Sequence, residues 1–460
     1  MKEFYKNLKK IIENTFSFHP GQNQLDSLAR LIFEITRREN VTLEKIIAYL
    51  KENAPVEKYS GRNKFIALKN TLVEYRFPQT SKRRKIDSTK IFLSKLRNPL
   101  ADNWQIKTNF KPLKIFVEKG AQKSRLLTNF RRKFPDTSVE EIDCYSRHLK
   151  KNKFTVSQLK KPLIFITKEK GDFIKRCPCT KNHLRCGYWI FNLGFGCPFD
   201  CSYCFLQQYS NFPGITLPAN IDDFFVSFDK FYETLKKPIR IGTGEFCDSL
   251  ALDDITEYSK LLIPYFSQKD VLFELKTKSD KIANLLTLKP SKNIIISWSL
   301  SPETIIKNEE KGTASLEMRL KAAKKVQDAG FRVGFHFDPI IHLKGWERLY
   351  DKVIHELYSH LKHPFAWISL GTLRCNRQLK TISELRFGQS NIFYGELFLG
   401  TDKKLRYPDF IKKEIYRKII KKIRFFDKNT PIYLCMENSQ TWADIDGLVP
   451  PDKIEASLSN

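Results

Sequence analysis

The spacing of apolar positions divides the chain into two parts. In the first part, apolar side chains recur at helical spacing in four segments, which turn residues at "HPGQN" and "NAPVEKYSG" interrupt. The segments cover residues 4–16, 25–38, 43–52 and 64–75. The pattern predicts an all-helical N-terminal domain over residues 1–110, and no known role follows from it.

From about residue 113, short β-rich apolar runs alternate with amphipathic segments such as "SLEMRLKAAKKVQDAG", which ends at Gly330. Seven runs have this character: 188–195, 238–244, 271–277, 293–300, 331–341, 365–372 and 431–437. Strand, helix and strand at this spacing predict a parallel α/β sheet or barrel, whose active site lies at the carboxyl ends of the strands. We expect a small α/β lead-in segment with a cysteine-rich loop over 111–187, and the barrel over 188–460.

Composition limits the class of protein. The chain has 460 residues, of which 41% are hydrophobic and 13% aromatic, too many for a disordered chain. No apolar run approaches the roughly 20 residues of a membrane span, and "MKEFYKNLKK" has no apolar signal-peptide core. Seven of the ten cysteines lie between residues 144 and 204, with Cys247 shortly beyond. We therefore expect a cytoplasmic protein with reduced, chemically employed thiols and no membrane association.

The chain is strongly basic, with 80 Lys and Arg against 51 Asp and Glu. This excess favours contact with a polyanion such as a nucleic acid, although lysines along helical faces are equally typical of solvated surface. The densest runs, "SKRRK" (81–85) and "NFRRKF" (129–134), are the candidates for phosphate contacts.

Three cysteines stand close together after the first run of the second part, in "GFGCPFDCSYCFLQQ": Cys197, Cys201 and Cys204. Three thiolates could bind zinc, but structural zinc usually takes four protein ligands from two paired motifs. An iron–sulfur cluster held by only three cysteines keeps one iron open to a small chelating ligand. The next three strand-like runs also end on polar residues, in "GTGEFCDS", "KTKSD" and "SWSLS", so the chemistry is expected at this edge.

The spacing Cys197-x3-Cys201-x2-Cys204, followed by aromatic Phe205, resembles that of the radical S-adenosylmethionine enzymes. The segments "GCPFDCSYCFLQ", "EFCDS", "ELKTK", "SWSLS", "EEKGTASLEMRLKAA" and "GFHFDPIIHLKGWERLY" are similar, in order and spacing, to those of the spore photoproduct lyase family. The resemblance covers about residues 112–437 and leaves the helical part outside.

The resemblance implies a partial (β/α)6 barrel of the TIM type. It also implies a [4Fe–4S] cluster that binds S-adenosylmethionine at its open iron and splits it reductively. Gly244 and Glu245 match the family motif that receives the methionyl ammonium, and a carboxylate is the expected partner of a cation. Lys278 and Ser299 match positions that contact the cofactor, although ordinary polar strand ends are the alternative.

Two further residues match catalytic positions. Cys247 aligns with the cysteine that returns a hydrogen atom to the product radical, whereas a lone cysteine is otherwise most often a small buried apolar residue. Tyr203 matches a tyrosine that relays the radical. The tyrosine that relatives carry after the third cysteine is Phe205 here, which puts a two-tyrosine relay in doubt.

A second thiol group precedes the cluster loop in "KRCPCTKNHLRCGY": Cys177, Cys179 and Cys186. With Cys144 or His183 it could form another metal site, such as a second cluster. Buried structural thiols are the more ordinary interpretation. Cys375 and Cys435 lie in apolar strand-like runs and are predicted core residues.

The sequence thus predicts a radical enzyme that repairs a thymine-dimer photolesion in DNA, with UV-damaged DNA and a reductant such as flavodoxin or ferredoxin as partners. An enzyme of the same scaffold that acts on a modified RNA base or a peptide is the alternative. An iron–sulfur protein that only binds nucleic acid fits less well, because the strand ends keep the residues that bind the cofactor. The sequence does not indicate an oligomeric state.

Overall fold

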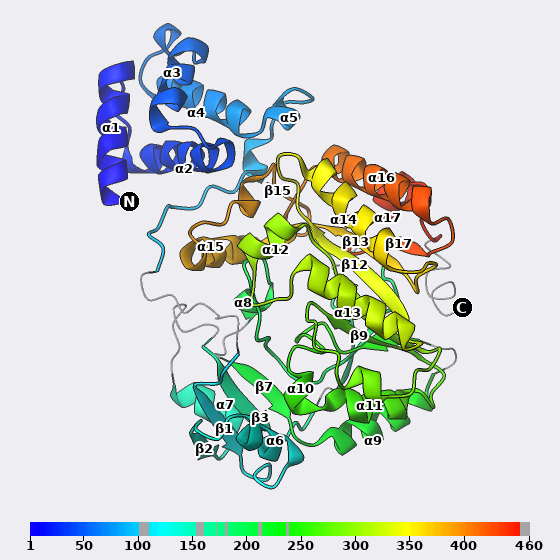
Figure 1. Cartoon of the computed structure of the whole chain (residues 1–460). Helices are drawn as coiled ribbons and strands as arrows, with labels where there is room; N and C mark the ends of the chain where they lie inside the picture. The colour runs from blue at the N-terminus through cyan, green and yellow to red at the C-terminus, as the bar shows by residue number, and fades with distance from the viewer. Residues whose placement is uncertain are drawn as a thin grey trace. The chain divides into compact units, whose positions relative to one another are not determined.

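A computed structural model describes residues 1–100, 110–152, 161–171, 173–179, 183–209, 214–235 and 239–450 (Figure 1). By its internal contacts the chain forms two compact units. The first comprises Met1–Ala101 and Arg374–Lys412, and the second Asp102–Leu373 and Lys413–Asn460. The domain boundaries that the sequence predicts at residues 110 and 187 stay a proposal. No helix in the described part of the chain is long and apolar enough to cross a membrane.

The first unit confirms the helices predicted near the N-terminus. Its helices are α1 (Lys2–Phe16), α2 (Gln22–Glu39), α3 (Leu43–Asn53), α4 (Arg62–Arg76) and α5 (Pro78–Ser81), with short 3-10 turns at Val56–Lys58 and Ser88–Lys90. The later segment adds β14 (Arg374–Asn376), α15 (Arg377–Arg386), a turn at Ile392–Tyr394, β15 (Phe398–Leu399), β16 (Lys404–Arg406) and the start of α16 (Asp409–Phe426). Strands β14, β16 and β15 form one antiparallel sheet. Cys375, in β14, is buried as predicted.

A buried ion cluster joins the two segments of this unit. The carboxylate of Glu34 in α2 accepts hydrogen bonds from Nε of Arg76 at 2.8 Å and from Nζ of Lys380, and it pairs with Nε of Arg30 at 3.2 Å. Burial alone would raise the pKa of Glu34, but Lys380, Arg76 and Arg30 lower it to about 2. Residues 374–412 are therefore tied to the helices by charge as well as by packing.

The second unit contains two parallel sheets. The smaller has the order β2-β1-β3-β7 and consists of β1 (Lys114–Glu118), β2 (Val139–Ile142), β3 (Leu163–Thr167) and β7 (Ile215–Pro218). Its helices are α6 (Arg125–Lys133) and α7 (Tyr145–Lys151). Strand β7 comes from beyond the cysteine loop, so the loop lies in the chain between the two sheets.

The larger sheet is the predicted partial barrel, and it has the order β17-β13-β12-β10-β9-β8-β5-β4. Its strands are β4 (Ile174–Arg176), β5 (Trp189–Phe191), β8 (Arg240–Gly242), β9 (Leu272–Thr277), β10 (Ile294–Ser299), β12 (Arg332–Ile340), β13 (Ile368–Thr372) and β17 (Ile432–Leu434). All seven predicted runs form strands, and these seven are parallel, one more than the six of the implied barrel. In the run 238–244 only residue 238 lies outside the described residues. The eighth strand, β4, is antiparallel to β5.

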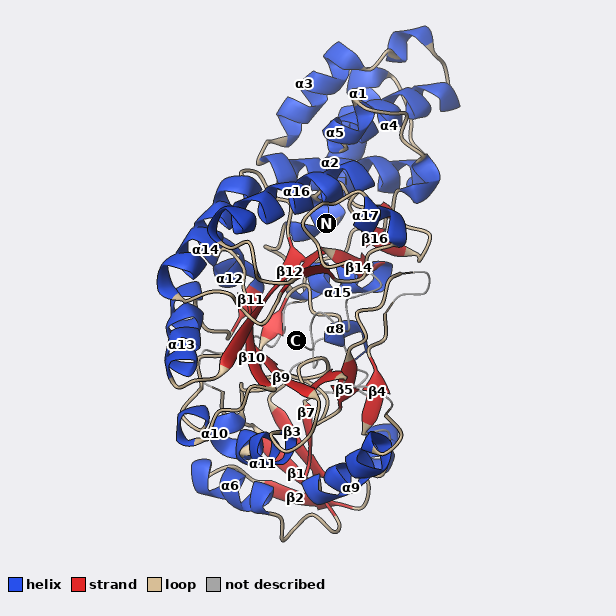
Figure 2. Cartoon of the chain, turned by 90° about the vertical axis from the view of Figure 1, so that its right-hand side faces the viewer, coloured by secondary structure: helices blue, strands red, loops and turns tan. Residues whose placement is uncertain are grey.

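Helices cover the outer face of this curled sheet, as Figure 2 shows for α13 (Leu316–Asp328) and α14 (Trp346–His360). The other helices of the unit are α8 (Leu206–Tyr209), α9 (Ile221–Tyr232), α10 (Asp253–Thr256), α11 (Tyr258–Phe266), α12 (Glu303–Glu309), α17 (Ser439–Ala443) and the rest of α16. In α13, Ser315 caps the first turn by accepting from the Met318 amide at 3.2 Å, and Gly330 follows the last turn with φ +97°. The helix therefore begins and ends where the sequence indicates.

The interior of the barrel carries buried polar side chains. Glu274 in β9 contacts Nε2 of His336 at 2.7 Å, and Nε1–H of Trp367 donates to the same carboxylate oxygen at 3.2 Å. Arg240 in β8 donates to the hydroxyl of Tyr433 in β17 at 2.8 Å. Sequence reasoning missed this layer, because a polar residue within a β-rich run does not reveal which way it points.

Replacing Glu34 by Gln should destabilise the first unit by about 3–5 kcal/mol, because Arg76 would lose this buried counter-charge and Arg30 and Lys380 would keep only their pairing with Glu384. The pKa of Glu34 is lower in the folded chain than its ordinary value of 4.5. Its contribution to stability is therefore complete above pH 4.5 and is lost as the pH falls towards about 2.

Urea unfolding of the full chain, followed by helical circular dichroism at several pH values, measures both effects. The E34Q variant should show a lower midpoint near neutral pH and a weaker loss of stability on acidification. An unchanged midpoint would contradict the assigned role of this ion cluster.

Candidate active site

The cysteine loop follows β5 and is held by backbone hydrogen bonds on three sides. Phe195 exchanges two of them with Thr216, at 3.0 and 2.8 Å, and the amide of Gly196 donates to Phe246 at 2.9 Å. The two-residue strand β6 (Asp200–Cys201) pairs antiparallel with β11 (Glu310–Lys311). The three thiols are thereby carried on a backbone whose position is set by neighbouring segments.

Two glycines permit this close packing. Gly194 and Gly196 have φ values of +124° and +96°. A Cβ atom on Gly194 would lie 2.3 Å from the carbonyl oxygen of Thr216, and one on Gly196 would lie 2.6 Å from that of Gly214. The motif "GFG" before the first cysteine is therefore required by the backbone.

Cys201 is buried, whereas Cys197 and Cys204 are partly exposed. Burial raises the pKa of the Cys201 thiol to about 12, against the opposing effect of the Lys278 ammonium. A metal that binds here must displace that proton. No three His, Cys, Asp or Glu in the described ranges form a group that could hold a single metal ion. Three soft thiol donors from one loop suit an iron–sulfur cluster, in which each thiolate binds a different iron.

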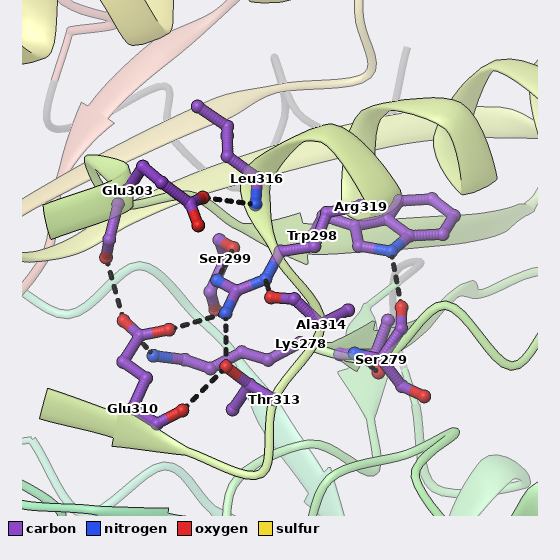
Figure 3. A network of polar contacts seen from close by, with 12 residues as sticks. Lys278, Ser279, Trp298, Ser299, Glu303, Glu310, Thr313, Ala314, Leu316 and Arg319 are labelled. Atoms are coloured by element: carbon purple, nitrogen blue, oxygen red, sulfur yellow. Dashed lines mark hydrogen bonds and ion pairs between the residues drawn. The ribbon is translucent and has the colours of Figure 1, made fainter. Parts of the chain in front are cut away.

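A buried carboxylate organises the polar residues beside the loop (Figure 3). Glu310 in β11 accepts from Nζ of Lys278 at 2.9 Å and from a terminal nitrogen of Arg319 at 2.6 Å. The hydroxyl groups of Tyr203 and Ser301 donate to it as well. Burial alone would raise the pKa of Glu310, but Lys278 and Arg319 hold it well below its ordinary value. Glu310 is therefore a permanent anion.

This network connects three of the residues that the sequence singled out. Tyr203, from the cysteine loop, donates to Glu310 and accepts from Nζ of Lys278, which follows β9. The backbone carbonyl of Ser299, at the end of β10, accepts from Arg319 at 2.8 Å. Burial, with the charge of Glu310, raises the pKa of Tyr203 well above its ordinary value, so the phenol keeps its hydrogen.

The loop after β8 carries Cys247. Its thiol donates to the carbonyl of Thr243 at 3.5 Å, and burial, followed by the nearby charge of Asp248, raises its pKa to about 12. The carboxylate of Asp248 accepts from the hydroxyl of Thr277 at 2.6 Å and from the amide of Lys278 at 2.7 Å. The Cys247 loop is thus tied to the strand end that supplies Lys278, and the thiol stays protonated.

Gly244 and Glu245 lie at the same end of β8. A Cβ atom on Gly244 would lie 2.7 Å from Cβ of Lys276 in β9, so packing alone requires glycine there. Burial would lower the pKa of Lys276, but Glu245, Glu274 and Asp338 hold it above its ordinary value. Glu245 therefore interacts electrostatically with a partly buried cation of the protein. Phe205 precedes α8, and its carbonyl accepts from the amide of Gln208 at 3.0 Å.

Comparison with known proteins agrees with this geometry. A model of the family described as "Spore photoproduct lyase" matches residues 182–393. The spore photoproduct lyase of a Geobacillus species is 31% identical over 173 residues, which are 37% of this chain and 51% of that protein. That of Bacillus subtilis is 31% identical over 169 residues, 36% of this chain and 49% of that protein. The matched segment is about half the length of these curated relatives.

Over this segment the chain is similar to the spore photoproduct lyases. Among solved structures, a spore photoproduct lyase complexed with dinucleoside spore photoproduct aligns with a TM-score of 0.61 at 23% identity, covering 71% of this chain and 99% of that chain. A variant of such a lyase with bound AdoMet and dinucleoside spore photoproduct aligns with a TM-score of 0.60 at 22% identity and the same coverage. At these identities the solved structures show the common fold.

The family match includes the cysteine loop, the ends of β8, β9 and β10, and the Glu310 network. It excludes the N-terminal helices and β17. Sequence reasoning named Tyr203, Lys278 and Ser299 but missed Glu310 and Arg319, which hold them together. The segment "EEKGTASLEMR" contains both, yet its pattern does not show that its two adjacent glutamates reach the cysteine loop, where Glu309 accepts from the hydroxyl of Ser202.

Replacing Glu310 by Gln should destabilise the barrel by about 3–5 kcal/mol, since Lys278 and Arg319 would be left as buried cations without a counter-charge. It should also speed amide hydrogen exchange in residues 197–205, because Tyr203 would lose its charged acceptor. Urea unfolding and hydrogen exchange followed by mass spectrometry measure the two effects.

Glu317→Gln in α13 is the matched control, because that carboxylate is exposed and pairs with exposed Lys321 at the surface. It should leave exchange in the cysteine loop unchanged. Equal exchange in both variants would show that Glu310 does not hold the loop.

Proposed function

We propose that this chain is a radical S-adenosylmethionine enzyme that repairs spore photoproduct, a thymine-dimer lesion, in DNA. The observation that carries the proposal is the three-thiol loop at the carboxyl end of the first barrel strand, in a segment that matches the family. Cys197, Cys201 and Cys204 would bind a [4Fe–4S] cluster. With S-adenosylmethionine bound, such a cluster supplies a 5′-deoxyadenosyl radical.

The residues of this chain have distinct tasks in that reaction. The methionyl group of the cofactor would bind beside Gly244, which has no side chain. The carboxylate of Glu245 would pair with the methionyl ammonium. The buried Glu310 network holds the cysteine loop in place and keeps water from its polar atoms. Lys278 and Ser299 would contact the cofactor directly. Because both belong to the Glu310 network, that network would also fix their positions.

Cys247 would return a hydrogen atom to the substrate radical from Sγ. Its raised pKa keeps the S–H bond intact at neutral pH, which a hydrogen-atom donor requires and a thiolate cannot provide. The ties of Asp248 to Thr277 and Lys278 fix the loop that carries this thiol. Tyr203, whose phenol also keeps its hydrogen, would restore the thiol, and Phe205 could take no part in this transfer.

The proposed partners are damaged DNA and a small electron donor such as flavodoxin or ferredoxin. The N-terminal 100 residues contain 21 Lys and Arg against 10 Asp and Glu. Lys82, Arg83, Arg84 and Lys85 after α5 are exposed, and so are Arg131, Arg132 and Lys133 at the end of α6. These two runs are the proposed contacts to DNA phosphates.

Cys201→Ala should abolish the four-iron absorbance of anaerobically reconstituted protein and all cleavage of S-adenosylmethionine, since one thiolate of three is lost. Cys375→Ala, a buried cysteine of the first unit, should change neither. Retention of the cluster in the Cys201 variant would contradict its assignment as a ligand.

Cys247→Ala should leave reductive cleavage of S-adenosylmethionine intact but divert the substrate radical to side products, because the hydrogen donor is missing. The measurement offers dinucleoside spore photoproduct to both proteins with dithionite and quantifies recovered thymine. Clean thymine recovery by the variant would contradict the role of Cys247.

The same assay separates the two candidate functions. If the unaltered chain cleaves S-adenosylmethionine without recovering any thymine, the scaffold acts on another substrate, such as a modified RNA base or a peptide. Phe205, where relatives of the implied family carry a tyrosine, is the observation that favours this second candidate.

A further inference from the structure

The barrel is open, and its two edge strands are β4 and β17. In the described part of the chain each pairs with only one neighbour of the sheet, β4 with β5 and β17 with β13. An edge strand leaves one row of backbone N–H and C=O groups without a partner in the sheet, and proteins usually cover or close such an edge. The segments that follow these two strands meet at one place, where the amide of Leu184 donates to the carbonyl of Glu437 at 3.0 Å.

Four of the ten cysteines lie on these two segments. Cys177, Cys179 and Cys186 follow β4, and Cys435 follows β17. The amide of Cys179 donates to the carbonyl of Cys177 at 2.7 Å, and that of Cys177 to Tyr188 at 3.0 Å. Residues 180–182 of this stretch lie outside the described residues.

Arg240 brings the two sides together. One terminal nitrogen of its guanidinium donates to Sγ of Cys186 at 3.0 Å, and the other donates to the hydroxyl of Tyr433 in β17 at 2.8 Å. Cys435 is two residues beyond that tyrosine. A thiol and the opposite edge strand therefore share one buried cation, which would stabilise a thiolate.

The thiols also influence one another. The side chain of Cys177 is in hydrogen-bond contact with that of Cys179. The four thiols lie on segments that the Leu184–Glu437 hydrogen bond and the two contacts of Arg240 hold together. Cys435 is thus not the core residue that the sequence predicts, since it is only partly buried and adjoins charged groups.

We propose that Cys177, Cys179, Cys186 and Cys435 bind a second iron–sulfur cluster, which joins the two open edges of the barrel. With four cysteines this site has no open iron. Its cluster therefore has a structural role, and S-adenosylmethionine binds at the first loop. Cys435 takes the place of Cys144 or His183 as the fourth ligand. Cys144 precedes α7 and contacts Ser146 in that helix instead.

Zinc fits these positions less well than a cluster. A single zinc ion needs its sulfur ligands at about 2.3 Å from one point. In the described residues no three His, Cys, Asp or Glu form such a group, and the thiols of the first loop do not either. The cysteines of a cluster bind separate irons, so their thiols need not converge on one point.

The test removes the first cluster and asks whether iron remains. Full-length protein with Cys197, Cys201 and Cys204 all replaced by Ala is reconstituted anaerobically with iron and sulfide. It should retain between about a third and a half of the iron of the unaltered chain, depending on whether the second site holds two or four irons, with iron–sulfur absorbance. This outcome does not depend on the proposed repair reaction.

Adding Cys177→Ala and Cys435→Ala to that variant should remove the remaining iron, whereas adding Cys144→Ala should not. In the otherwise unaltered chain, Cys435→Ala should remove only the second share of iron and leave cleavage of S-adenosylmethionine intact, which excludes general unfolding. The proposal is overturned if the triple variant binds no iron, if its iron survives the loss of Cys177 and Cys435, or if zinc occupies the site instead.

Discussion

The buried carboxylate of Glu310 is the contact on which the arrangement of the site depends. It accepts hydrogen bonds from Lys278 at the end of β9, from Arg319 in α13 and from Tyr203 in the cysteine loop. A charge enclosed to this degree is stable only while its cationic partners stay in place. The same pairing that satisfies the charge therefore fixes the thiol loop against two strand ends.

Close backbone approach is the second constraint, and it explains the glycines of the site. Gly194 and Gly196 let the cysteine loop pass beside Thr216 and Gly214, and Gly244 lets the end of β8 lie against Lys276. Larger residues would move the loops apart and separate the thiols from Glu245, the proposed contact of the methionyl ammonium. Charge and steric fit thus act on the same few segments.

The sequence predicted the parts of the molecule that follow from short-range patterns. The spacing of Cys197, Cys201 and Cys204, the seven strands and the N-terminal helices all follow from local periodicity or spacing. It could not predict what depends on distant pairing: β7 joins the strands of the small sheet, residues 374–412 join the N-terminal helices through Lys380 and Glu34, and Leu184 donates to Glu437. Glu310 was missed for the same reason, since its four partners come from separate segments.

The central claim is that a three-thiol loop leaves one iron open for S-adenosylmethionine. Electron paramagnetic resonance of the reduced, reconstituted protein tests it most directly, with and without cofactor labelled with ¹⁵N at its amino group. The account predicts that the cofactor changes the spectrum of the reduced cluster and that the label couples to it. An unchanged spectrum with no coupling would contradict the account.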